Sequence, residues 1–368
     1  MSVQETRLAS FFYTLLKMAA STPAITTPWL DAFCVGGFSF LLVPVFFVVG
    51  PEAFFEKLLI LTITINMPHF IASYRLLYQR REMITRYRSA AIYVPCGLLA
   101  YGVVSLAMVP VTVLPVYLLL VGSGVYLAWH YTGQAWGMMA SFAYLAGRPF
   151  EDLERTLIRR GLIALLVFHA VAFLRFSQVT RVVFRELGLL NDFVDAITAI
   201  YLVVSVAAFV FCLIGIEGMR RYVKRTGAWP PLRVALPWLA IHLWYVAIAY
   251  DMRAIFWVQI SHAVQYLIFP FRVEVNRRFE GQEPSRGRIA GHLLGYAAAL
   301  IAVGALWNPV VPWLLTAPAN SALGPQGGIL LPAVMIAILN VHHYFADSCV
   351  WKISNPTVRR DLFLHIHS

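Results

Sequence analysis

The feature that most constrains the fold is a succession of long apolar segments with few charges. A helix needs about 20 mostly apolar residues to cross the hydrocarbon core of a membrane. About ten segments approach this length, at residues 29–50, 53–74, 90–109, 116–140, 161–176, 193–216, 234–250, 254–271, 289–307 and 328–350. Because a spanning segment must satisfy its own backbone polar groups, we expect an all-α, polytopic membrane helix bundle of about ten transmembrane helices. The composition agrees, since 60% of the 368 residues are hydrophobic and only 13% are charged.

The basic residues predict the orientation of this bundle. The formal net charge is +11, and Lys and Arg gather after the second, fourth, sixth, eighth and tenth apolar segments. Cytoplasmic loops carry an excess of these residues, so ten spans would place both termini in the cytoplasm. The clusters separate apolar runs and form no stripe on a soluble face, which indicates topology and not binding of nucleic acid. We expect a multi-pass protein of the lipid bilayer, in the cytoplasmic membrane if the source is bacterial.

Two short segments flank the predicted transmembrane domain, residues 29–350. Residues 1–28 alternate apolar and polar positions at helical spacing, which predicts a segment on the membrane surface. Residues 351–368 are predicted to be a cytoplasmic tail. Asp31 lies near a span end and is expected to be solvated. Small residues on the fourth span are interpreted as a face for close helix approach: Gly122, Ser123, Gly124, Gly133 and Gly137.

Histidines inside the spans carry the functional prediction. They fall in the middle or cytoplasmic half of the second, fourth, eighth and tenth spans, at His69, His130, His262, His342 and His343. Four of them have a carboxamide or carboxylate about one helical turn away, on the same helix face. These pairs are Asn66 with His69, His130 with Gln134, His262 with Gln265, and His343 with Asp347. A metal-binding imidazole usually hands its second ring nitrogen to such a partner, and ionisable groups at this depth are commonly functional.

We therefore predict a metal site whose ligands come from His69, His130, His262, His342, His343 and Asp347. Adjacent residues on a helix point roughly 100° apart. His343 is preferred because it shares a face with Asp347, while His342 could bind a second metal or a substrate. Whether His242 joins the site stays open. A lone intramembrane histidine can also serve as a hydrogen-bonding residue between helices, but five at matched depth favour a metal or haem site.

Imidazole ligands with one carboxylate suit iron, copper or zinc. We expect mononuclear or dinuclear iron first, with copper or zinc as alternatives. An iron site inside the bilayer predicts an oxygenase, hydroxylase or desaturase that uses O₂ on a lipophilic molecule. Tyr131, Tyr344 and Gln134 are the expected catalytic residues, because they lie beside the ligands and can hydrogen-bond to oxygen. The sequence has no nucleotide or flavin fingerprint, so the electrons must come from an external donor or from the substrate.

The Pro68–His69 pair, followed by single histidines on later spans, resembles the Brp/Blh family, the bacteriorhodopsin-related β-carotene 15,15′-dioxygenases. The resemblance implies a multispan enzyme in which His69 and the later histidines bind iron. That family continues with Gly and a nearby Asp, whereas Phe70, Ile71 and Ala72 follow here, so a carotenoid substrate is not implied. Two other classes stay open, a haem-binding electron-transfer protein with two axial histidines and a polytopic transporter.

Overall fold

The computed structural model describes residues 23–353 and 355–367, and these residues form helices without any strand. The N-terminal segment predicted at residues 1–28 lies mostly outside the described residues. The first half of the chain contains α2 (Pro28–Ala32), η1 (Phe33–Gly37), α3 (Phe38–Leu61), η2 (Thr62–Asn66), α4 (Met67–Tyr78), α5 (Arg81–Arg86), η3 (Ser89–Tyr93), α6 (Val94–Ala107), α7 (Leu114–Leu145) and α8 (Asp152–Phe176). The second half contains α9 (Gln178–Glu186), α10 (Leu190–Thr226), α11 (Leu232–Tyr250), η4 (Met252–Ala254), α12 (Ile255–Arg278), α13 (Arg286–Ala305), η5 (Leu306–Val310), α14 (Val311–Leu323), α15 (Pro325–Val350) and α16 (Pro356–His367).

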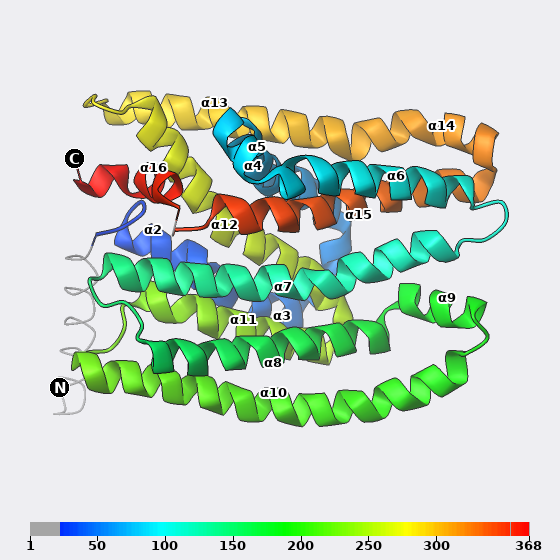
Figure 1. The fold of residues 1–368 in the computed structure, drawn as a ribbon, viewed down its shortest axis with the longest axis horizontal. Helices are drawn as coiled ribbons and strands as arrows, with labels where there is room; N and C mark the ends of the chain where they lie inside the picture. Colours follow the sequence, from blue (N-terminus) through cyan, green and yellow to red (C-terminus); the bar gives the residue numbers. More distant parts are fainter. Residues whose placement is uncertain (1–22, 354, 368) are drawn as a thin grey trace.

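Nine helical segments in the described part of the chain are long and apolar enough to cross a membrane. The long helices lie side by side along the longest axis of the molecule (Figure 1), which confirms the predicted all-α bundle. The predicted span at 53–74 is the one without a counterpart among the nine. The helix breaks at Gly50, where φ is 75°, and the chain continues through η2 into α4. Asn66, His69 and Ser73 lower the hydropathy of this stretch, and all three are buried in the bundle.

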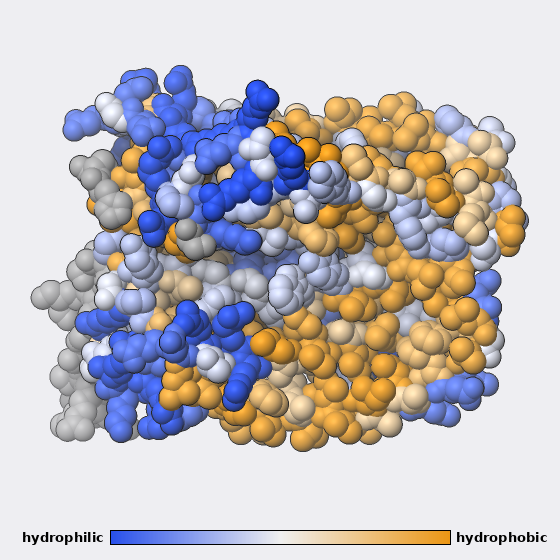
Figure 2. Space-filling view, in the orientation of Figure 1, coloured by the Kyte–Doolittle hydropathy of each residue, from blue (hydrophilic) through white to orange (hydrophobic). Residues whose placement is uncertain are grey.

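One end of the bundle is polar. It holds α16 and the loops that join α7 to α8, α10 to α11 and α12 to α13 (Figure 1), and we call it the basic end. Figure 2 shows hydrophilic side chains gathered there and a mostly hydrophobic surface over the rest of this face. Such a surface suits contact with lipid tails.

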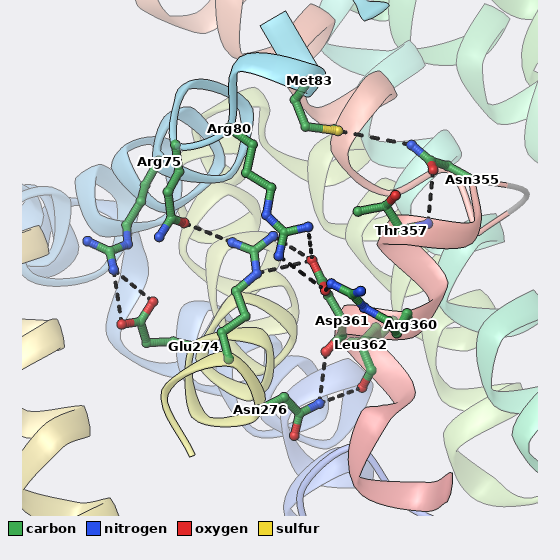
Figure 3. A network of polar contacts seen from close by, with 12 residues as sticks. Arg75, Arg80, Met83, Glu274, Asn276, Asn355, Thr357, Arg360, Asp361 and Leu362 are labelled. Atoms are coloured by element: carbon green, nitrogen blue, oxygen red, sulfur yellow. Dashed lines mark hydrogen bonds and ion pairs between the residues drawn. The ribbon is translucent and has the colours of Figure 1, made fainter. Parts of the chain in front are cut away.

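The C-terminal segment, predicted to be a tail, contains α16, which packs against the bundle in its described residues. Asp361 is 4% exposed and pairs with Arg80 of the α4–α5 connection, with Arg277 of α12 and with Arg360 (Figure 3). Asn276 of α12 donates to the carbonyl oxygens of Asp361 and Leu362, at 2.9 and 3.1 Å. These contacts fix α16 across the basic end.

The expectation that Asp31 is solvated is wrong. Its side chain is fully buried, accepts hydrogen bonds from the backbone N–H groups of Ile25 and Thr26, and pairs with Arg233 at 3.4 Å. Arg233 is itself 3% exposed. A buried charge needs partners of this kind, and the pair ties the start of α2 to the start of α11.

Candidate metal centre

Four helices bring one buried histidine each to a single point inside the bundle. The residues are His69 of α4, His130 of α7, His262 of α12 and His343 of α15, and none is more than 5% exposed. One ligand atom of each lies within 4.8 Å of the others. The structure therefore brings together four of the histidines singled out from the sequence.

The local sequence around His69 favours an unusual helix start. A π-helical turn, η2, leads into α4, and Pro68 occupies the first turn of α4. A proline is tolerated there because its missing N–H costs no helical hydrogen bond. Single π-turns inside helices are frequent at functional sites. The Nδ1 atom of His69 lies 2.9 Å from the carbonyl oxygen of Asn66 in this turn, which fixes the ring.

The Nε2 atoms of the four imidazoles face one another. The distance is 2.7 Å between His130 and His262, and 3.2 Å between His343 and His130. The His69 ring centroid lies 4.4 Å from that of His343 and 5.1 Å from that of His262. The Nε2 atom of His69 is buried without a hydrogen-bond partner.

The hydrogen bonds of the outer ring nitrogens assign the protons. In His69, Nδ1 must donate because the Asn66 carbonyl can only accept. The Ser73 hydroxyl donates to the Phe70 carbonyl oxygen at 2.9 Å, so its oxygen accepts from Nδ1 of His343 at 2.7 Å. In neutral imidazole only one ring nitrogen carries a proton. The Nε2 atoms of His69 and His343 therefore present lone pairs to the interior.

Asp347 favours the same tautomer in His130, with the proton on Nδ1. Its Oδ2 atom lies 3.5 Å from Nδ1 of His130, and its Oδ1 atom is buried without a partner. With Nδ1 of His130 protonated toward this carboxylate, a third lone pair points inward. His262 can offer at most one proton among these lone pairs. A cation is the partner that satisfies all of them, and imidazole nitrogen suits a transition metal.

Asp347, predicted as a ligand, lies outside the four-imidazole group. It contacts a ligand and not the centre, as the outer partners of metal-binding histidines commonly do. His342 also lies outside the group. Its Nε2 atom lies 3.0 Å from the Ala90 carbonyl oxygen and 3.2 Å from the Tyr78 hydroxyl, and its ring stacks on Tyr74. The 100° offset from His343 turns it toward α4 and η3.

The three expected catalytic residues surround the centre in different ways. Tyr131 lies with its ring centroid 4.6 Å from that of His262, and its buried hydroxyl has no hydrogen-bond partner. Tyr344 stacks on His130 at 4.9 Å. Gln134 donates to the carbonyl oxygen of His262 at 3.2 Å, so it links α7 to α12.

Two other residues clarify what the sequence could reveal. His242 lies apart from the group, since its Nδ1 atom contacts the Trp238 carbonyl oxygen at 2.8 Å. Ser73 was not predicted, although it holds His343 in place. It lies one turn after His69 on the same face, and that spacing was the available signal.

A cavity of about 650 Å³ lies beside the centre, between α7, α12, α15 and α16. His130, Asp347 and Tyr344 line its inner part, and aromatic side chains such as Trp129 and Phe345 line its walls. This volume falls within the range of roughly 300–1,000 Å³ typical of small-molecule sites.

Comparisons with known proteins identify no relative of this chain: no protein-family model, no curated protein and no solved structure matches it.

Proposed function

We propose that the protein is a membrane-embedded oxidoreductase that uses a non-haem iron, held by the four histidines, to oxidise a lipophilic molecule with O₂. The observation that carries the proposal is the buried group of four imidazoles, in which hydrogen bonds on Nδ1 of His69 and His343 turn Nε2 inward and Asp347 lies 3.5 Å from Nδ1 of His130. The apolar cavity against His130 supplies a place for the substrate.

The number of ligands favours iron over zinc. Structural zinc is tetrahedral, and four imidazoles would close its coordination. A six-coordinate metal held by four nitrogens keeps two positions free, and a bound iron with open positions supplies the chemistry of dioxygen activation. The resemblance of the Pro68–His69 region to the Brp/Blh family agrees with this choice.

The protein's own residues would position and protect the reaction. Asp347 and Ser73 hold two imidazoles in the orientation that exposes Nε2. Tyr131 offers a buried hydroxyl near His262, and Tyr344 covers one face of His130. The surrounding aromatic walls exclude water, which strengthens every polar interaction inside the site.

The alternative of a haem protein fits the geometry less well. Two axial histidines would need a free plane between them for the porphyrin. Here the other two imidazoles occupy that space, because ligand atoms of all four residues lie within 4.8 Å of one another.

Oxygen uptake by the purified protein tests the proposal. Protein loaded with Fe(II) in lipid nanodiscs would be mixed with a chemical reductant and fractions of a bacterial lipid extract. We expect O₂ consumption coupled to an oxygenated or desaturated lipid for the wild type, and none for His343→Ala. Iron-loaded wild type that consumes no O₂ above its lipid-free background with any fraction would contradict the proposal.

We also propose that the basic end faces the cytoplasm, because Lys and Arg accumulate in its loops. An external electron donor would then reach the protein at this end. The basic surface at this end of the bundle suits an acidic donor protein.

A further inference from the structure

A second cavity lies next to the first along α7. It has a volume of about 510 Å³ and lies between α6, α7 and α15. The two cavities share Tyr126 and Phe345 in their walls. We call the combined space the α7 groove.

Three glycines of α7 line the groove. Gly133 and Gly137 line the first cavity and Gly122 lines the second. A Cβ atom added at any of the three would meet no other heavy atom within 4 Å, apart from the neighbouring helix backbone. The sequence predicts that these glycines form a surface for close helix approach. The open space beside them shows that this prediction is wrong for all three. Gly124 alone of the predicted glycines serves this approach, since a Cβ atom there would meet the Phe173 ring.

The groove is reachable from the bilayer. Trp129, Leu118 and Tyr101 line it, and each is more than 40% exposed on the lipid-facing surface. The walls of the second cavity are almost entirely apolar. A hydrocarbon chain can therefore enter sideways without crossing water.

The charges that line the groove are placed at different depths. Among the described lining residues, only Asp347 and Lys352 carry a formal charge at neutral pH. Asp347 is buried beside His130, whereas Lys352 follows the end of α15 at the basic end and is exposed. The Nζ atom of Lys352 lies 5.6 Å from the Tyr87 ring centroid, which leaves the ammonium without a carboxylate partner among the described contacts. An anionic group is attracted to the exposed ammonium of Lys352.

The centre lies part of the way along the groove. Ser141, near the basic end, follows His130 by about 16 Å of helix, and Leu118 precedes it by about 18 Å, at about 1.5 Å per residue. A chain extended from the Lys352 end would reach the centre with its middle carbons and continue into the second cavity.

We propose that the groove binds one long-chain fatty acid, with its carboxylate at Lys352 and a mid-chain carbon beside His130. This inference deepens the proposed function, on which its catalytic meaning rests, by naming the substrate class and the orientation. The single cation among the described lining residues suits one carboxylate.

Equilibrium binding of radiolabelled oleate and oleyl alcohol to the nanodisc-embedded protein tests this arrangement. Lys352→Met should weaken oleate binding by roughly two- to fivefold, the range of one partly exposed ion pair. It should leave oleyl alcohol binding unchanged. Lys224→Met, which removes an exposed lysine from α10, is the matched control and should change neither. Gly137→Phe should weaken the binding of both ligands, because the ring would occupy part of the first cavity.

The outcomes separate this inference from the proposed function. An unchanged ratio of oleate to alcohol affinity in Lys352→Met would overturn the headgroup assignment, and full binding in a folded Gly137→Phe variant would overturn the groove.

His343→Ala should retain oleate binding while it loses oxidation. If the wild type binds oleate as expected but takes up no iron, the proposed function fails and the binding inference stands. If iron-loaded protein oxidises other lipids without binding oleate, the inference fails alone.

Discussion

At the scale of single residues, the centre depends on the groups that hold the outer nitrogen of each imidazole. Nδ1 of His69 donates to the Asn66 carbonyl oxygen, and Nδ1 of His343 donates to the Ser73 hydroxyl. Nδ1 of His130 lies 3.5 Å from Asp347 of α15. Asp347 lies one turn from His343 but contacts a histidine of another helix, so it supports the group of four imidazoles from outside.

Asp347→Asn tests the contact with His130. The amide keeps the size of the side chain but loses the charge that favours the Nδ1-protonated imidazole. We expect metal affinity to fall by about tenfold, the lower part of the range for such outer partners. Competition with a coloured chelator would measure it. Asp195→Asn, an exposed position on α10, should behave as wild type, and an equal affinity in Asp347→Asn would remove Asp347 from the site.

At the scale of elements, most helices followed from apolar runs of spanning length. The span predicted at 53–74 has no counterpart among the long apolar helices of the described residues, because the buried polar residues of η2 and α4 reduce its hydropathy. The break at Gly50 agrees with the predicted end of the first span at residue 50, whereas the π-turn η2 left no clear pattern in the sequence. Helix α16 was predicted only as a tail, since its helical packing depends on Asp361 meeting arginines from two distant segments.

Asp361→Asn tests how α16 is held. Loss of the buried carboxylate leaves Arg80 and Arg277 without a charged partner, and we expect a cost of about 2 kcal/mol to the docking of α16. Hydrogen exchange of the amides in residues 356–367 should become about 30-fold faster, since 1.4 kcal/mol corresponds to a factor of ten. Glu280→Gln, an exposed change of the same charge at the basic end, should leave exchange unchanged. Equal protection in both variants would show that apolar packing alone holds α16.

At the scale of the whole molecule, the sequence predicted the bundle and the four helices that carry the centre. It could not predict which helices are neighbours, because apolar faces that meet lipid and those that meet protein are alike in composition. The packing of α15 against both α4 and α7 brings residues 69, 130 and 343 together. The α7 groove also depends on how α6, α7 and α15 pack. The sequence could not predict it, because glycines on a helix are equally typical of close helix contact.

Metal content of the purified protein tests the central claim most directly. Wild type and the His→Ala variants at positions 69, 130, 262, 342 and 343 would be produced with iron, zinc and copper supplied, and analysed by mass spectrometry. Circular dichroism would confirm that each variant is folded. We expect about one bound metal per chain in the wild type and in His342→Ala, and a large loss in each of the other four variants. Metal-free wild type that resists reconstitution, or a loss in His342→Ala equal to that in His343→Ala, would contradict this expectation.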